Sequence, residues 1–308
     1  MHRENLLKLI NNVEKVVVGK TERVKLLIVG LLTNGHILIE DVPGLGKTTL
    51  ALALAKSISG DFKRIQFTPD LLPSDVTGGS IYLPKTGEFE FRKGPVFTNI
   101  MLADEINRTT PRTQSALLEC MQEFKVSIDG RTLLLPQPFM VVATENPIEY
   151  QGTYPLPEAQ IDRFLMKIDM GYLPQEEEIK VVQGQKVIHP IDELSPVMVL
   201  DDILGLQSAV KNIEVSVHVV DYIVKLVSST RNKEDIKLGA SPRASIALMK
   251  ASSAWAMLEG RDYVIPEDVV KLLPWVLKHR ITLHPKALIA GTTPELIISE
   301  LSRSTPIP

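Results

Sequence analysis

The segment EDVPGLGKTT contains the residue types of a phosphate-binding loop. Such a loop needs glycines where the backbone turns closely around phosphates, a lysine that neutralises their charge, and a hydroxyl that ligates Mg²⁺. These groups are supplied by Gly44, Gly46, Lys47 and Thr48. Asp41 stands where the usual pattern, G-x-x-x-x-G-K-[ST], has its first glycine. Because this first position makes no phosphate contact that the chemistry requires, we expect the loop to bind nucleotide with an aspartate there.

A pair of acidic residues ends the apolar run IMLADE. Asp104 and Glu105 follow a predicted buried strand, at the carboxyl edge where open α/β sheets bind their ligands. We expect Asp104 to hold Mg²⁺ through water and Glu105 to polarise the attacking water as a general base. Two acids after a strand are common on protein surfaces, so this prediction depends on their combination with the loop.

Another apolar run, FMVVATEN, ends in Asn146. Thr144 lies on the same face of this predicted strand, two residues earlier. An amide at this position can hold the attacking water or the γ-phosphate opposite Glu105. Asn-Pro after a strand is also an ordinary start of a turn, and this simpler interpretation stays open for Asn146 taken alone.

Two arginines are candidates for binding the γ-phosphate. Arg163 follows the third predicted strand and its loop, in the segment PEAQIDRF. Arg243 lies in the first turn of a predicted helix that Ser241 caps. A guanidinium at a helix start that points across a domain cleft can clamp a phosphate. Each arginine taken alone is more often a partner in a surface salt bridge.

The elements that must position these residues form an α/β pattern. Apolar runs at 36–40, 100–105 and 139–146 are separated by helical patterns, which predicts a parallel sheet with crossover helices. Two β-prone insertions, 80–97 and 125–136, interrupt this pattern, and an Asp-Gly turn in the second favours a hairpin. Hairpins that project from such a sheet are suited to contacting partners.

The second half of the chain has a helical pattern. Beyond about Pro174, segments such as VHVVDYIVKLV place their apolar residues on one face. The proline-containing segment 185–197 is the best candidate for a linker. We therefore predict a nucleotide-binding α/β core over residues 1–185 and a smaller all-α lid domain over residues 186–308.

The composition narrows the functional classes. With 308 residues, 44% hydrophobic and 23% charged, the chain suits a folded protein of two domains. A formal net charge of -3 gives no overall basic field that would attract nucleic acid. Cys120 is the single cysteine and the six histidines are scattered, so neither a disulfide nor a zinc site is expected. The sequence has no secretion signal and no run as long as a membrane helix, and we expect a cytoplasmic protein.

Taken together, these motifs resemble those of the MoxR family of AAA+ ATPases. The resemblance covers nearly the whole chain, because matching segments occur in the order of the family. These segments are EDVPGLGKTTLA, RIQFTPDLLPSDVTG, FRKGPVF, ADEINRTTPRTQSALLECMQE, VATENPIEYQGTYPLPEAQIDRF and GASPRA. MoxR-type loops often carry Asp-Val-Pro-Gly, so Asp41 fits the resemblance. The resemblance implies that the chain binds ATP and Mg²⁺.

The resemblance also implies roles for individual residues. Asn146 corresponds to sensor 1, Arg163 to an arginine finger supplied to the ATP of a neighbouring subunit, and Arg243 to sensor 2 in the lid. The implied nucleotide-binding residues are Val18, Gly19, Pro43, Gly44, Leu45, Gly46, Lys47, Thr48, Thr49 and Arg243. The implied catalytic residues are Lys47, Glu105, Asn146 and Arg163, and the implied metal ligands are Thr48 and Asp104.

An arginine finger donated by a neighbour requires a ring, so the resemblance implies a homo-hexamer. Residues 80–97 occupy the place of the helix-2 insert of the family, and residues 125–136 that of the pre-sensor 1 hairpin. Arg108 and Arg112 are expected to face the subunit interface or the pore. The implied work is chaperone-like remodelling of a client protein, often one with a von Willebrand factor A domain.

Three other functions stay open at this point. A nucleotide-switched scaffold would bind ATP to assemble and scarcely hydrolyse it, and the presence of Glu105, Asn146 and Arg163 argues against it. A magnesium-chelatase-like motor subunit is close in mechanism and ranks lower because of the segment matches. A nucleic-acid motor is disfavoured because neither predicted hairpin has a dense basic cluster interleaved with aromatic residues. We expect no nucleic-acid partner and no membrane insertion.

Overall fold

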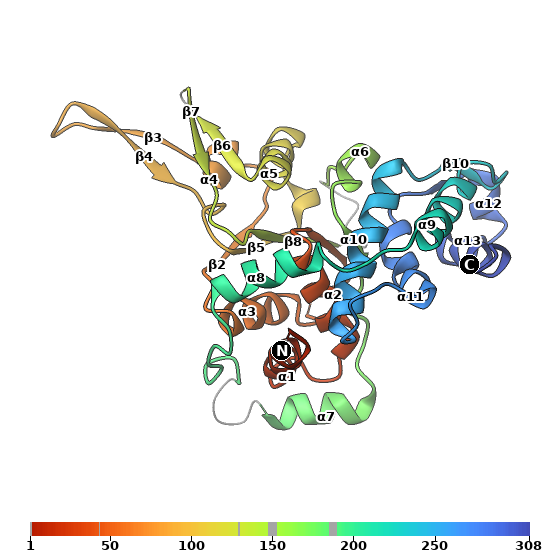
Figure 1. The fold of residues 1–308 in the computed structure, drawn as a ribbon. Coiled ribbons are helices and arrows are strands. Elements are labelled where there is room, and N and C mark those ends of the chain that lie inside the picture. Colours follow the sequence, from red (N-terminus) through yellow and green to blue (C-terminus); the bar gives the residue numbers. More distant parts are fainter. Residues whose placement is uncertain (1, 43, 129, 147–152, 185–189) are drawn as a thin grey trace.

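The first half of the chain folds around a sheet of five parallel strands (Figure 1). The computed structural model describes the chain except for residues 1, 43, 129, 147–152 and 185–189. The strands lie in the order β2–β5–β8–β1–β9. Their bounds are Ile37–Glu40 (β1), Phe62–Gln66 (β2), Ile100–Asp104 (β5), Met140–Glu145 (β8) and Met166–Ile168 (β9). Because neighbouring strands are parallel, their carboxyl ends meet at one edge of the sheet.

Helices cover both faces of this sheet, which is why its central strands are apolar on both sides. Ile37 and Ile39 pack into one hydrophobic core cluster, while Leu38 between them packs into the other. Helices α1 (His2–Glu14), α2 (Thr21–Leu32) and α3 (Lys47–Ser57) pack into the first cluster, together with helices of the second half of the chain, and α5 (Pro111–Glu123) packs into the second. The predicted parallel α/β core is thus confirmed.

Two strands of this sheet did not follow from the hydrophobic pattern. The edge strand β2 has the sequence FKRIQ, in which Lys63, Arg64 and Gln66 are exposed, so it has no apolar run. The other edge strand, β9, has only three residues. Edge strands of these kinds carry too weak a periodicity to be recognised without the rest of the sheet.

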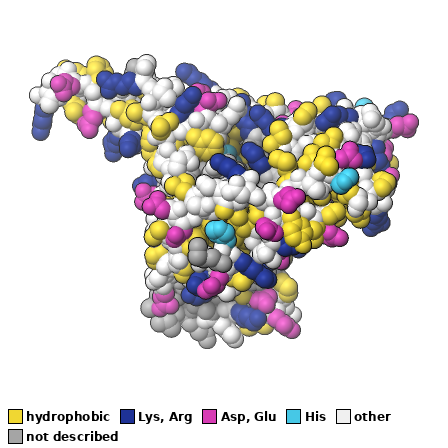
Figure 2. Space-filling view, in the orientation of Figure 1, with side chains coloured by type: hydrophobic (Ala, Val, Ile, Leu, Met, Phe, Trp, Pro, Cys, Tyr) yellow, Lys and Arg dark blue, Asp and Glu magenta, His cyan; other side chains and the backbone are white. Residues whose placement is uncertain are grey.

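Two hairpins project from the core next to α5 (Figure 1). They coincide with the β-prone insertions 80–97 and 125–136, except that the first hairpin already begins at Gly78. Figure 2 shows the β3–β4 hairpin standing out from the body of the molecule. The short elements of this region are α4 (Pro73–Thr77), β3 (Gly78–Leu83), β4 (Glu88–Lys93), η1 (Ile106–Arg108), β6 (Lys125–Ile128), β7 (Arg131–Leu134) and α6 (Glu158–Ile161).

The second half of the chain is mainly helical, as predicted. Its two short strands pair in antiparallel fashion. The elements are α7 (Gln175–Gly184), α8 (Leu200–Val210), α9 (Val217–Ser229), β10 (Ile236–Leu238), α10 (Pro242–Leu258), α11 (Pro266–Leu277), β11 (Thr282–Leu283), α12 (Pro285–Ile289) and α13 (Pro294–Ser304).

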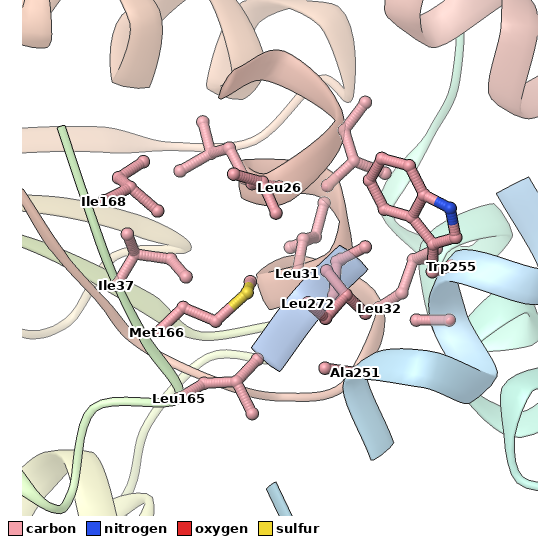
Figure 3. Close-up of a cluster of buried hydrophobic side chains, with 14 of the residues drawn as sticks. Leu26, Leu31, Leu32, Ile37, Leu165, Met166, Ile168, Ala251, Trp255 and Leu272 are labelled. Atoms are coloured by element: carbon pink, nitrogen blue, oxygen red, sulfur yellow. The ribbon is translucent and has the colours of Figure 1, made fainter. Parts of the chain in front are cut away.

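The first core cluster continues from the sheet into these helices. Figure 3 shows side chains of α2 and the sheet, such as Leu26 and Ile37, in the same cluster as Trp255 of α10 and Leu272 of α11. A shared core of this kind limits the freedom of the lid to move as an independent body.

The described part of the expected linker, residues 190–197, is packed against the core. Ile191 and Leu194 are buried in the first cluster. The N–H of Val197 donates to the carbonyl oxygen of Ser57 at 2.9 Å. The local sequence showed the prolines of this segment. It could not show that the apolar side chains between them pack against the core. The domain boundary after residue 185 stays a prediction, because residues 185–189 lie outside the described part.

The surface shown in Figure 2 mixes basic and acidic side chains. No large area of one sign dominates this face, in agreement with a formal net charge of -3. Among the described helices, none is both long enough and apolar enough to cross a membrane.

His36 is a buried polar residue next to the start of β1. Its Nε2 lies 2.8 Å from the carbonyl oxygen of Met121, and its Nδ1 accepts the N–H of Val141 at 3.0 Å. These partners assign the neutral tautomer with the proton on Nε2. Burial lowers the pKa of His36 to about 4, although the bond to Met121 acts in the opposite direction.

We expect the folded protein to lose stability as the pH falls below about 6.5. The unfolded chain protonates His36 near its ordinary pKa, whereas the folded chain resists protonation until about pH 4. The free energy of unfolding therefore falls progressively across this window, by about 3 kcal/mol at pH 4 from this group alone. Urea unfolding between pH 7.5 and pH 4.5 measures the effect.

His36→Gln is the matched variant for this prediction, because glutamine keeps a donor and an acceptor but cannot titrate. Its free energy of unfolding should depend less steeply on pH than that of the wild type. His279, whose pKa is also lowered by burial, contributes equally to both proteins. Equal slopes for the two proteins would contradict the role of His36.

Candidate functional site

The phosphate loop, residues 41–49, connects β1 to α3 at the carboxyl edge of the sheet. Gly44 and Gly46 have φ angles of 87° and 85°, in the region that favours glycine. A Cβ built at either position would have no heavy atom within 4 Å, so both glycines border open space. The N-terminal N–H groups of α3, which begins at Lys47, face this space and favour an anion. Pro43, which we predicted to bind nucleotide, lies outside the described residues.

Lys47 places its ammonium close to several acidic residues. Its Nζ donates to the backbone carbonyl oxygen of Asp41 at 2.7 Å. Burial lowers the pKa of Lys47, and the carboxylates of Asp104, Asp41 and Glu105 act in the opposite direction. Lys47 therefore lies within electrostatic reach of both acidic residues at the end of β5.

A buried hydroxyl joins the ends of β5 and β8. The Oγ1 of Thr144 donates to Oδ1 of Asp104 at 2.6 Å and accepts the N–H of Glu105 at 2.8 Å. Glu105 has a φ of 55°, an uncommon left-handed conformation for a residue other than glycine, and such conformations occur often at functional sites. Asn146 follows directly after β8 and is buried. The structure thus brings the predicted acids to the edge that carries Asn146.

The oxygen donors at this edge fit Mg²⁺. The carboxylate of Asp104 and the hydroxyl of Thr48 are hard ligands of the kind that Mg²⁺ prefers. Within the described residues there is no cluster of three or more acidic, histidine or cysteine side chains that could hold a metal by itself.

Two residues of β2 belong to the site although sequence analysis did not identify them. Arg64 donates to Oδ2 of Asp104 from Nη2 at 2.6 Å and from Nε at 3.1 Å. Gln66 donates from Nε2 to Oε2 of Glu105 at 2.6 Å, and Arg108 donates to the same oxygen at 2.9 Å. The parallel register places Gln66 opposite Asp104. The contacts of Arg64 and Gln66 depend on the position of β2 beside β5, so no local motif could have shown them.

A cavity of about 480 Å³, the nucleotide cavity, extends from the phosphate loop toward α7. Gly44, Leu45, Gly46 and Thr49 line its loop side. Its other side is more apolar and is lined by residues that include Val16, Val17, Val18, Tyr172 and Leu173. Gly19 has a φ of 72°, and a Cβ there would lie only 3.0 Å from the side chain of Leu173. Val18 thus lines the nucleotide cavity, and Gly19 lies against Leu173, another residue of its lining.

Arg163 and Arg243 lie at a different cavity of about 190 Å³, the arginine cavity. Arg163 donates from Nη1 to the carbonyl oxygen of Leu118 at 3.0 Å. Arg243 is half-exposed, and its Nη1 lies 3.9 Å from Oδ2 of Asp162. Among the described residues of the phosphate loop, none lines the arginine cavity. The structure brings the two predicted arginines together and does not bring them to the loop of their own chain.

The buried Arg280 fixes the geometry of the arginine cavity. Its Nε donates to Oδ1 of Asp162 at 2.7 Å. Its other N–H groups donate to backbone carbonyl oxygens, including that of Phe164 at 2.6 Å. Burial lowers the pKa of Arg280, and the carboxylate of Asp162 acts in the opposite direction. Ser241, the N-cap of α10, also donates to Asp162, so the start of α10 is held beside Arg163.

The two arginines that follow β5 take different places. Arg108 contacts Glu105 through the ion pair described above. Arg112 is exposed in the first turn of α5. Their expected roles at a subunit interface or pore stay predictions.

Two family models match the chain. One, described as the ATPase family associated with various cellular activities (AAA), matches residues 36–166. The other, an AAA lid domain, matches residues 228–301. The first range contains the phosphate loop and both acids of β5, and the second contains α10 and Arg243. These matches define the class of the protein as an AAA-type ATPase core followed by its lid.

Three relatives match the chain over nearly its whole length. Protein YeaC of Bacillus subtilis (strain 168) is 54% identical over 98% of this chain and 94% of its own length. Chaperone MoxR1 of Mycobacterium tuberculosis is 45% identical over 98% of this chain and 82% of its own. Protein MoxR of Methylorubrum extorquens is 30% identical over 92% of this chain and 89% of its own. The chain therefore belongs to the MoxR family of AAA+ ATPases.

A solved structure supports the same assignment. The crystal structure of a protein from Cytophaga hutchinsonii, which carries a provisional ATPase assignment, superimposes with a TM-score of 0.92. It is 42% identical in sequence and is matched over 100% of this chain and 96% of its own.

We expect Arg64→Met to increase the affinity of the site for Mg²⁺. The guanidinium of Arg64 neutralises the carboxylate of Asp104 and competes with a cation for it. The Mg²⁺ concentration that gives half-maximal ADP binding should fall roughly threefold, a modest factor because Arg64 is half-exposed. Isothermal titration calorimetry with ADP at a series of Mg²⁺ concentrations measures this midpoint.

The matched control is Lys63→Met on the same strand. Lys63 is exposed and points to the opposite face of the sheet, because side chains alternate along a strand. Its removal should leave the midpoint unchanged. A midpoint that moves equally in both variants, or only in the control, would show that Arg64 does not act through Asp104.

Proposed function

We propose that the chain binds ATP with Mg²⁺ in the nucleotide cavity and hydrolyses it with help from a neighbouring subunit. The observation that carries this proposal is the division of charged groups between the phosphate loop and the arginine cavity. Lys47, Asp104 and Glu105 cluster at the phosphate loop, whereas Arg163 and Arg243 line the arginine cavity. A phosphoryl-transfer site whose base is in place, but whose predicted arginines, Arg163 and Arg243, line another cavity, becomes complete when a second copy of the chain supplies them.

Binding of the phosphates follows from the geometry of the loop. The N–H groups of the loop and the start of α3 bind phosphate oxygens, and Lys47 neutralises the β- and γ-phosphates. Lys47 exchanges its bond to the carbonyl oxygen of Asp41 for these oxygens. Thr48 and Asp104 hold Mg²⁺, which supplies further charge neutralisation when it is bound.

The hydrolytic step depends on Glu105. Its carboxylate accepts the proton of the attacking water, after exchanging its bonds to Gln66 and Arg108 for that water. Asn146 directly follows the neighbouring strand β8, where its amide can orient the same water or the γ-phosphate. The intact base supports an enzyme rather than a scaffold that only binds nucleotide.

Arg163 and Arg243 act together on the ATP of the adjoining subunit. Both line one cavity, and Arg280 holds the backbone on either side of Arg163 in place. Two guanidinium groups presented side by side can bind the oxygens of a γ-phosphate. We propose a closed ring of six chains, the number that the resemblance implies, because a head-to-tail contact that closes generates a ring.

We propose that the ring remodels a client protein. One relative is named a chaperone, and two hairpins project from the core, where they can contact another protein. Tyr82 and Phe89 are exposed on one face of the β3–β4 hairpin, with ring centroids 5.4 Å apart. A von Willebrand factor A domain as client rests on the family resemblance. A cytoplasmic setting agrees with the single, buried cysteine, Cys120.

Arg163→Ala should bind ATP as the wild type does but hydrolyse it on the order of 10³-fold more slowly. The substitution leaves the phosphate loop and the base intact and removes one of the charges that stabilise the transition state. Phosphate release measures the rate, and a fluorescent ATP analogue measures binding. Arg303→Ala, at an exposed arginine of α13, is the control and should keep the wild-type rate.

Mixed rings test whether Arg163 acts on the neighbour. Glu105→Gln and Arg163→Ala should each be inactive alone. In a co-assembled equimolar mixture, about a quarter of the interfaces pair an intact Glu105 with an intact Arg163, and hydrolysis should return accordingly. Mixed rings that form but stay inactive would contradict donation in trans. A wild type that assembles with ATP and does not hydrolyse it would favour the scaffold instead.

A further inference from the structure

Asp41 is the residue at which the phosphate loop departs from the usual glycine. It does not adopt the left-handed backbone conformation that would favour glycine. Its carboxylate accepts three backbone N–H groups. Oδ1 accepts that of Val42 at 2.8 Å, and Oδ2 accepts those of Met170 at 2.7 Å and Gly171 at 2.9 Å. The side chain therefore has partners both in its own loop and in a segment that is distant in sequence.

The distant segment follows β9, the strand that pairs with β1. The Nζ of Lys20 donates to the carbonyl oxygens of Met170 and Gly171, at 2.7 Å and 2.6 Å. Burial lowers the pKa of Lys20, while the carboxylate of Asp41 acts in the opposite direction. Two charged side chains thus bind the backbone of Met170 and Gly171. Asp41 accepts their N–H groups, and Lys20 donates to their carbonyl oxygens.

This segment forms a wall of the nucleotide cavity. Gly171, Tyr172 and Leu173 line the cavity opposite Gly44 and Gly46. Asp41 is the first residue of the phosphate loop. The two residues that its carboxylate binds, Met170 and Gly171, lead into the wall. A displacement between Asp41 and Gly171 therefore changes the distance between the two sides of the cavity.

We propose that Asp41 is a positioning residue that joins the phosphate loop to the wall formed by residues 171–173. The bond fixes the separation between the phosphate-binding side and the opposite side of the cavity. A ligand that occupies both sides, such as a nucleoside diphosphate, benefits from this fixed separation. A ligand that occupies only the phosphate side does not. This inference rests on the proposed binding of nucleotide in this cavity.

A turn within the loop does not explain these contacts. The bond to Val42 alone would be an ordinary local bond of an aspartate to the following residue. Two of the three bonds instead go to the segment after β9. The carbonyl group that Lys47 contacts belongs to the backbone of Asp41, so any residue at this position can supply it. Replacement of the Asp41 side chain consequently removes the bonds to Met170 and Gly171 but keeps the bond of Lys47 to the backbone carbonyl group.

The test compares two ligands in the wild type and in Asp41→Gly, which restores the usual glycine. Calorimetry measures the affinities for ADP with Mg²⁺ and for inorganic tripolyphosphate with Mg²⁺. The affinity for ADP should fall at least about tenfold, because two charge-assisted bonds are lost. The affinity for tripolyphosphate should change less than about threefold. An unchanged affinity for ADP, or an equal loss for both ligands, would overturn the inference.

Two further variants separate positioning from general loss of structure. Lys20→Met removes the bonds to the carbonyl oxygens of the same segment and keeps most of the aliphatic stem. Like Asp41→Gly, it should lower the affinity for ADP relative to that for tripolyphosphate. Asp41→Asn keeps one acceptor oxygen for Met170 and Gly171, and its ratio should lie between those of the wild type and Asp41→Gly. The proposal would be contradicted if Lys20→Met left this ratio of affinities unchanged. It would also be contradicted if Asp41→Asn had the same ratio as Asp41→Gly.

Asp268→Asn is the control for loss of stability alone. Asp268 is buried in the first turn of α11, accepts Arg261 and the N–H of Ile265, and does not line the nucleotide cavity. It should lower the melting temperature without changing the ratio, and a changed ratio here would mean that the ratio reports only stability. A wild type that binds no ADP would refute nucleotide binding, whereas failure confined to the variants refutes only the role of Asp41.

Discussion

A single buried cation, the guanidinium of Arg280, determines how the lid meets the core. All five of its N–H groups are bonded: Nε to Oδ1 of Asp162, and the others to the carbonyl oxygens of Asp162, Phe164, Leu165 and Val276. An unpaired charge at this depth would cost several kcal/mol, so the segment 162–165 must stay where these acceptors meet Arg280. Arg163 lies between two residues that Arg280 holds, and Arg243 lies in the first turn of the helix whose cap contacts Asp162.

This arrangement is the basis of our proposal that two chains complete each site. The parallel sheet gathers Lys47, Asp104 and Glu105 at its carboxyl edge, because all its strands end there. The lid is fixed by Arg280 and by a core cluster shared with the sheet, so Arg243 remains at the arginine cavity. Assembly is therefore part of the proposed chemistry, since each chain offers a base at one place and two arginines at another.

The sequence predicted those parts of the site that local patterns determine. The glycines, lysine and hydroxyl of the loop lie within a few residues of one another, and Asp104 and Glu105 directly follow an apolar run. Arg64 and Gln66 could not be predicted, because they reach the acids only through the pairing of β2 with β5. The position of Arg243 beside Asp162 likewise depends on how the lid docks, which no local pattern encodes. The hydrogen bonds of Asp41 join residues about 130 positions apart, a distance at which periodicity gives no signal.

The central claim is that hydrolysis requires two chains at each site. The most direct measurement is the steady-state rate of ATP hydrolysis per chain over a wide range of protein concentration, beside the assembly state measured by sedimentation with the same nucleotide. If a second chain completes each site, the rate per chain rises with concentration and its midpoint coincides with that of assembly. A full rate per chain at concentrations where the protein sediments as a monomer would contradict it.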